Sequence, residues 1–141
     1  MPKVFFDASI IIAALISEKG GSHKLLRYAR EGKIFAVTSQ TVINEVKANL
    51  HKVKGVSENN LTNLIKSSKI IIRKRVTKNE ISSFIGAVDD KDAHVLAGGV
   101  LTGCEYLVTL DKKHFLNKKV VEKVKNIKIL SPKTLLQLKS L

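Results

Sequence analysis

Cysteine, tryptophan and proline are nearly missing from this chain of 141 residues, which has one cysteine, no tryptophan and two prolines. A lone cysteine, Cys104, cannot form a disulfide within the chain, so the disulfide-stapled folds of small secreted proteins are excluded and a cytoplasmic location is expected. No cysteine and histidine pair has the spacing of a zinc site. Long apolar runs are missing too, because the stretch 10–16 is too short to span a bilayer. No membrane association is therefore expected.

Acidic residues are scarce: the chain has 12 Asp and Glu against 25 Lys and Arg, a formal net charge of +13. Such a balance favours a polyanionic partner, because each basic side chain placed on a phosphate releases condensed counterions. A lysine-rich surface that serves only solubility is the alternative that charge alone leaves open. Hydrophobic residues make up 44% of the chain, enough for a core, and the length is typical of one domain.

Apolar blocks alternate with polar connectors along the whole chain, and the pattern predicts an α/β fold. Alternating strands and helices indicate a central parallel sheet covered by helices on both faces, a three-layer α/β/α arrangement. Gly98 and Gly99 fall inside a predicted helix, where close packing on the sheet would explain them. Strands are expected at 4–6, 34–38, 70–76, 106–110 and 127–130, and helices at 8–17, 23–32, 41–53, 58–67, 80–87, 92–102, in one or two pieces within 112–124, and after Ser131-Pro132.

Four acids fall near strand ends or helix starts. Asp7 and Asp111 follow predicted strands, Asp92 opens a helix, and Glu45 lies one turn into the helix after the second strand. Ligands of open α/β sheets bind beyond the carboxyl ends of the strands, so these carboxylates converge if the first, second and fourth strands are neighbours. Each also has an ordinary explanation: a helix cap or turn for the three aspartates, and a solvated charge for Glu45.

The chemistry of such a cluster points to a metal ion. Several carboxylates cannot share a small site cheaply unless a cation neutralises them, and oxygen ligands favour Mg²⁺ or Mn²⁺. Ser9 and Thr109 are placed to hydrogen-bond the carboxylates and orient them, although ordinary strand and cap use explains them equally well. The basic run 73–75 and the lysines within 112–128 are the residues most expected to face RNA.

The order of these motifs resembles that of the PIN domain family. Asp7 lies in VFFDASIIIAAL, where Ser9 matches a Ser, Thr or Asn that often follows the first acid, and Glu45 lies in TSQTVINEVKANL. Asp92 and Asp111 lie in DDKDAHVLAGGVLTGCEYLVTLDKKHF. Each motif is short and degenerate, but four in this order, over nearly the whole chain, are a fairly specific signal.

The resemblance implies a metal-dependent endoribonuclease that cleaves RNA phosphodiester bonds. It implies that Asp7, Glu45, Asp92 and Asp111 are catalytic, that the three aspartates bind Mg²⁺ or Mn²⁺, and that Asp89 is an additional or outer ligand. Many small members are VapC-like toxins of toxin–antitoxin pairs, inhibited by a small partner protein and often dimeric. RNA, an antitoxin protein and a second copy of the chain are therefore the expected partners of a single PIN-like nuclease domain over residues 1–141.

Two other functions fit parts of the pattern. One is a non-catalytic RNA-binding or assembly domain of the same fold. The other is a phosphoacceptor receiver domain, which usually carries an acid pair after its first strand, whereas Asp7 stands alone. His94 lies two residues beyond Asp92, so it is expected to point away from the acids, with a packing or surface role.

Overall fold

The computed structural model describes residues 1–115 and 117–139, which form a five-stranded parallel sheet between two layers of helices. The order β3-β2-β1-β4-β5 places β1 at the centre, with β2 and β4 as its parallel neighbours. The first, second and fourth strands are neighbours, which is the condition under which the acids can converge. The strands are β1 (Lys3–Phe6), β2 (Phe35–Ser39), β3 (Ile71–Arg73), β4 (Tyr106–Val108) and β5 (Lys128–Leu130).

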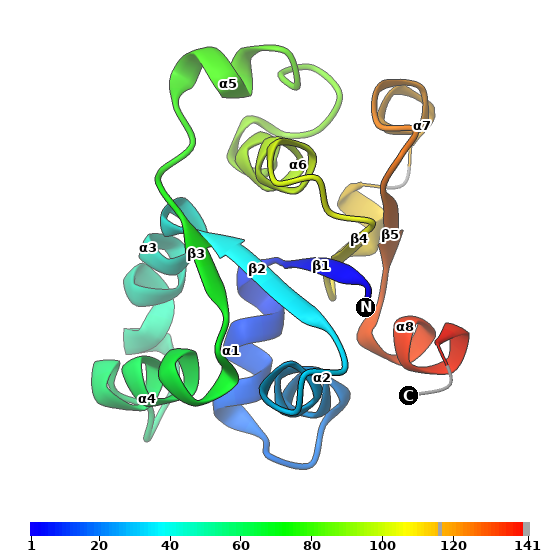
Figure 1. The fold of residues 1–141 in the computed structure, drawn as a ribbon. Helices are drawn as coiled ribbons and strands as arrows, with labels where there is room; N and C mark the ends of the chain where they lie inside the picture. The colour runs from blue at the N-terminus through cyan, green and yellow to red at the C-terminus, as the bar shows by residue number, and fades with distance from the viewer. Residues whose placement is uncertain (116, 140–141) are drawn as a thin grey trace.

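Figure 1 shows the two helical layers: α1 to α4 and α8 lie on one side of the sheet, and α5 to α7 on the other. The predicted three-layer α/β/α class is confirmed. The α-helices are α1 (Ala8–Ile16), α2 (Gly21–Arg30), α3 (Gln40–Asn49), α4 (Glu58–Ser68), α5 (Lys78–Ser82), α6 (Asp90–Leu101), α7 (Lys118–Lys123) and α8 (Pro132–Leu138), and two short 3₁₀ helices are η1 (Leu50–Lys52) and η2 (Lys112–His114). None of the described helices is long and apolar enough to cross a membrane.

The central strand and the helix above it hold the core together. Val4, Phe5 and Phe6 are completely buried, as expected of a strand with both faces covered. A Cβ atom added at Gly98 of α6 would lie 2.5 Å from Cζ of Phe5, and one at Gly99 would lie 2.8 Å from Cδ1 of Ile127. These contacts confirm that the paired glycines allow α6 to approach the sheet closely.

Several helix starts follow their predicted capping chemistry. The Ser57 hydroxyl accepts a hydrogen bond from the Asn60 N–H, and Asn60 Oδ1 accepts one from the Ser57 N–H. Ser131 caps α8, with Pro132 in its first turn. These side chains satisfy amides that a helix leaves unpaired at its start, so the local sequence fixes where the helices begin.

Some predicted strands and helices are too long or displaced. The strand expected at 106–110 ends at Val108 because the next amides bond to side chains: Leu110 N–H donates to Ser9 Oγ, and Asp111 N–H donates to Thr109 Oγ1. The strand expected at 70–76 ends at Arg73, beyond which Val76 N–H donates to Thr41 Oγ1. The helix expected at 80–87 instead spans Lys78–Ser82, because Thr77 caps it.

The sheet has one point where its strand order reverses. The chain runs from β1 outward through β2 to β3, then returns to the other side of β1 to form β4 and β5. In open α/β sheets the crevice at such a reversal, beyond the carboxyl ends of the strands, is where ligands bind. Asp7 follows β1 directly and Thr109 follows β4 directly, so both lie at this point.

Candidate active site

Asp7 is buried at the carboxyl end of β1, with 7% of its surface exposed. Its Oδ1 accepts a hydrogen bond from Ala8 N–H at 2.7 Å, so the carboxylate caps α1. Its Oδ2 accepts from Thr109 Oγ1 at 2.6 Å and from Ser9 Oγ at 3.3 Å. Asp7 therefore caps a helix and also lies at the sheet edge where the acids were expected to meet.

Ser9 and Thr109 form a small hydroxyl network around Asp7. Thr109 is fully buried, and its Oγ1 lies 3.4 Å from Ser9 Oγ. Each hydroxyl also accepts an amide hydrogen bond from the segment after β4, Ser9 from Leu110 and Thr109 from Asp111. The hydroxyls thus tie Asp7 to the strand end that carries Asp111, and the contacts expected of Ser9 and Thr109 are present.

Glu45 reaches the site from α3. Its Oε2 is buried and has no hydrogen-bond partner among the described residues, although the side chain as a whole is 40% exposed. His94 Nε2 of α6 lies 3.3 Å from this oxygen, but not in hydrogen-bonding geometry. The Nδ1 atom of His94 is likewise buried and without a partner in the described part of the chain.

Asp92 lies in the first turn of α6, two residues after its start, and its side chain is 17% exposed. Its Oδ2 is buried without a hydrogen-bond partner among residues 1–115 and 117–139, and His114 Nδ1 lies 3.7 Å away. The prediction that Asp92 opens the helix is wrong by two residues. Asp89 occupies the N-cap position without a side-chain capping bond, and Asp90 is the first helical residue.

The electrostatics link three of the acids. Burial raises the pKa of Asp7 above its ordinary value, against the lowering effect of the Thr109 and Ala8 hydrogen bonds, and the negative charge of Glu45 raises it further. Burial also raises the pKa of Asp92; His114 and Lys91 lower it, and Asp89 and Glu45 raise it. Glu45 is therefore the shared neighbour of Asp7 and Asp92, and the ionised forms of both aspartates are costly.

Asp111 is placed differently from the other acids. It precedes η2, and its side chain is exposed without a hydrogen bond or ion pair among the described residues. Its link to the site runs through its backbone, because its amide donates to the hydroxyl that holds Asp7. The fold brings the strand end of Asp111 to the site, while its carboxylate is exposed to solvent.

The acids are linked through Glu45, whose charge raises the pKa of both Asp7 and Asp92. Across residues 1–115 and 117–139, no group of three or more His, Cys, Asp or Glu side chains is arranged to hold a metal ion. The donors nonetheless fit a hard divalent cation in their chemistry, because the acids offer only oxygen and two of those oxygens are buried without a hydrogen bond. A cation would also offset the burial cost that raises the pKa of Asp7 and Asp92.

Two residues have surroundings that the sequence did not indicate. His94, expected to point away from the acids, lies beside Glu45 of α3, in the buried part of α6 that runs from Ala93 to Gly99. Arg73, expected to face RNA, forms an ion pair with Glu80 at 2.5 Å, whereas Lys74 and Arg75 are exposed. Only a polar residue inside the otherwise apolar helix pattern of α6 could have signalled the position of His94.

Comparisons with known proteins agree with this geometry. The profile of the PIN domain matches residues 3–113, which include all four acids. No curated protein sequence matches the chain.

Two solved structures share the fold. PAE2754 from Pyrobaculum aerophilum superposes with a TM-score of 0.63 at 17% identity, over 99% of this chain and 96% of the other. VapBC2 from Rickettsia felis, solved bound to a DNA fragment from their promoter, superposes with a TM-score of 0.62 at 15% identity, over 92% of this chain and 98% of the other. Together with the strand order and the placement of Asp7, the profile match shows that the chain belongs to the PIN domain family.

Proposed function

We propose that this protein is a divalent-metal-dependent endoribonuclease that cleaves RNA phosphodiester bonds, and that residues 1–141 form one nuclease domain. The observation that carries the proposal is a pair of buried carboxylate oxygens, Glu45 Oε2 and Asp92 Oδ2, that lack hydrogen-bond partners among the described residues. The negative charge of Glu45 raises the pKa of both Asp7 and Asp92, so the three acids share one electrostatic environment. A protein does not leave such oxygens unpaired without cost, and a cation is the ligand that would relieve it.

In this proposal Asp7, Glu45 and Asp92 hold Mg²⁺ or Mn²⁺, and Asp111 adds a carboxylate from the exposed side. Such an ion, when bound, supplies Lewis acidity that activates water and neutralises charge on the scissile phosphate. The chain's own residues do the positioning. Ser9, Thr109 and the Ala8 amide hydrogen-bond both oxygens of Asp7 and hold the carboxylate in place. The charge of Asp89 makes the electrostatic potential around Asp92 more negative.

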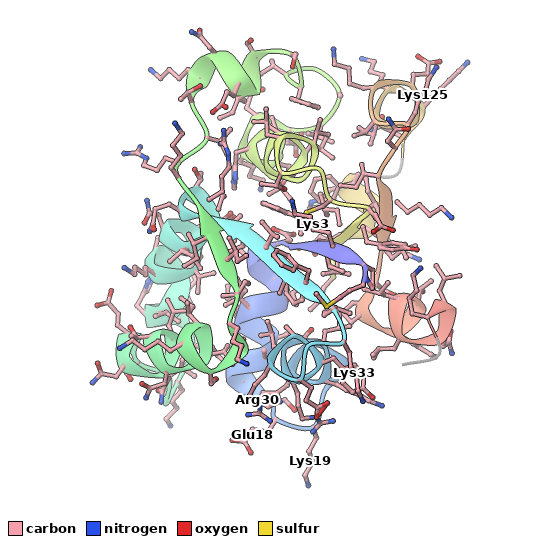
Figure 2. All side chains as sticks on the ribbon, viewed as in Figure 1. Lys3, Glu18, Lys19, Arg30, Lys33 and Lys125 are labelled. Carbon is pink, nitrogen blue, oxygen red and sulfur yellow. The ribbon has the colours of Figure 1, made fainter. Side chains whose placement is uncertain are left out.

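The basic surface supports RNA as the substrate. Figure 2 shows many charged side chains projecting outward from the helices and loops, whereas Asp7 is buried at the end of the central strand. Lys74 and Arg75 follow β3, and Lys112 and Lys113 follow Asp111, so exposed cations lie near strand ends on both sides of the site. Phosphates of a bound strand would be attracted to these flanks while the acids repel them unless a cation is present.

A non-catalytic RNA-binding domain is the competing function, and one observation favours it: the acids are not preassembled around one point. A labelled RNA incubated with the purified protein distinguishes the two. The nuclease proposal predicts cleavage in Mg²⁺ or Mn²⁺ that stops in EDTA and falls at least a thousandfold in Asp7→Asn, about 4 kcal/mol of transition-state stabilisation. Salt-dependent RNA binding without turnover at any metal concentration would favour the competing function.

We also propose that the protein is the toxin of a toxin–antitoxin pair, as the resemblance to VapC-like toxins implies. The fold shared with VapBC2, which was solved bound to promoter DNA, supports this assignment only at the level of architecture. Expression of the chain alone should arrest bacterial growth, and co-expression of a cognate small protein encoded beside it should restore growth. Growth arrest by Asp7→Asn as strong as that of the wild type would contradict a nuclease toxin.

A further inference from the structure

An open groove lies beside the acids, between the loop that precedes α6 and the segment from η2 to α7. It has a volume of about 560 Å³ and is lined by residues 86–89, His114 and residues 117–119. A second hollow continues it past Ile85 and Lys123 and shares Gly86, Ala87 and Lys119 with the first. The two adjoining hollows extend from Asp89 and His114 at one end to Ile85 and Lys123 at the other.

Hydrogen bonds join the two walls of this groove. Asn117 Nδ2 donates to the Ala87 carbonyl at 2.8 Å, and Lys119 Nζ donates to the Gly86 carbonyl at 3.4 Å. Gly86 has a left-handed backbone with φ of +92°, and a Cβ atom there would meet nothing within 4 Å. The walls are therefore held at a fixed separation, and the floor at Gly86 stays open.

The inner end of the groove meets the candidate active site. His114, part of its lining, lies with Nδ1 3.7 Å from Asp92 Oδ2. Asp89, on the opposite wall, is close enough for its charge to raise the pKa of Asp92. A ligand that fills the groove would thus end beside the acids.

The outer part of the groove has a different character. Lys118, Lys119 and Lys123 are exposed there together with one acid, Glu122, and Ile85 presents an apolar side chain that is 56% exposed. Cations for a phosphate backbone beside an apolar contact for a base are what single-stranded nucleic acid uses. A carboxylate-rich protein segment would also satisfy the lysines. RNA is favoured because the groove ends beside the acids of the proposed nuclease site.

We propose that this groove binds single-stranded RNA on one side of the cleaved bond, with Lys118 and Lys119 contacting backbone phosphates. The proposal rests on the proposed ribonuclease function and names where its substrate runs. It assigns the groove a binding role that can be measured without catalysis.

The test is the affinity of Lys118→Gln/Lys119→Gln for a fluorescein-labelled single-stranded RNA, measured by anisotropy in EDTA between 50 and 200 mM salt. Each lost phosphate contact lowers the salt slope by about 0.7, so two losses lower it by about 1.4. The wild type should then lose about sevenfold more affinity over this salt range than the double variant. Lys118→Arg/Lys119→Arg should bind like the wild type, and circular dichroism melting should confirm folding.

Lys19→Gln/Lys33→Gln is the matched control. Figure 2 shows both lysines beside α2, and Lys33 precedes β2 at the amino edge of the sheet, opposite the acids. This control should keep the wild-type slope. An equal slope in the groove variant and the wild type, or no RNA binding by the wild type, would overturn the groove proposal.

Cleavage by the wild type in Mn²⁺ is scored separately, so the groove proposal and the nuclease proposal can fail independently. If the wild type never cleaves RNA but the groove variant loses RNA binding, the groove proposal is supported and the nuclease proposal is refuted. Displacement of RNA by polyglutamate as effectively as by unlabelled RNA, abolished in the groove variant, would instead assign the groove to an acidic protein segment.

Discussion

The replacement Thr109→Val tests how the fold holds Asp7. The Thr109 hydroxyl is fully buried, donates to Asp7 Oδ2 at 2.6 Å and accepts from the Asp111 amide at 3.0 Å. Valine has nearly the same shape, so the substitution removes these two hydrogen bonds and little packing. The change therefore isolates the polar contribution of one atom.

The expected loss of stability is about 1.5–3 kcal/mol, the range for a hydrogen bond to a charged group. The exposed Asp111 can pair its freed amide with water, so the loss of the second bond adds little. For a chain of 141 residues, each kcal/mol lowers Tm by roughly 3 °C, which gives a fall of about 5–10 °C. The carboxylate also loses its fixed orientation, which should lower metal-dependent cleavage by about 10- to 100-fold.

The assay combines thermal unfolding in EDTA with RNA cleavage at saturating Mn²⁺. Thr109→Ser keeps the hydroxyl and should retain most of the cleavage rate, even if the lost methyl group lowers Tm. In an Asp7→Asn background, Thr109→Val should cost less stability, because its charged acceptor is gone. Wild-type Tm and wild-type cleavage in Thr109→Val would refute the inference that this hydroxyl positions Asp7.

Three further predictions concern charge and packing. Burial raises the pKa of Asp92, so the stability contributed by its protonated form is fully present below the ordinary pKa of 3.8 and is lost as pH rises through the folded-state pKa. At pH 7 in EDTA, Asp92→Asn should therefore raise Tm. Mn²⁺ should stabilise the wild type more than this variant. Arg73 lowers the pKa of Glu80 to about 2, so the ion pair stabilises above pH 4.5 and is lost as pH falls; Glu80→Gln should destabilise in urea at pH 7 but hardly at pH 2. Gly98→Ala should cost about 1–3 kcal/mol through the clash with Phe5, whereas Gly20→Ala, whose nearest contact is 3.8 Å away, should cost less in the same melting assay.

The parts of this fold that depend on local chemistry could be predicted from the sequence. Hydrophobic blocks located the five strands, and cap residues such as Ser57 and Ser131 located helix starts. The glycine pair in α6 indicated close packing on the sheet. Asp7 could be identified as a candidate site residue because a buried strand ends directly before it. The alternative explanation for an acid at that position is a helix cap.

Contacts between distant elements could not be predicted in the same way. The proximity of His94 to Glu45 depends on how the sheet brings the starts of α6 and α3 together, which the sequence near either residue does not specify. The early end of β4 depends on the hydroxyls of Ser9 and Thr109, which accept hydrogen bonds from the amides of Leu110 and Asp111. For the same reason, the sequence placed Asp111 among the acids, while the folded chain leaves its carboxylate exposed.

Calorimetric titration of Mn²⁺ into the purified protein at neutral pH tests most directly whether these acids form a cation site. The wild type should bind Mn²⁺ saturably, and Asp7→Asn, Glu45→Gln and Asp92→Asn should each bind it at least tenfold more weakly, because each removes a carboxylate charge from the site. Equal Mn²⁺ affinity in the wild type and these three variants would contradict this prediction. So would RNA cleavage by a wild-type protein that binds no divalent ion.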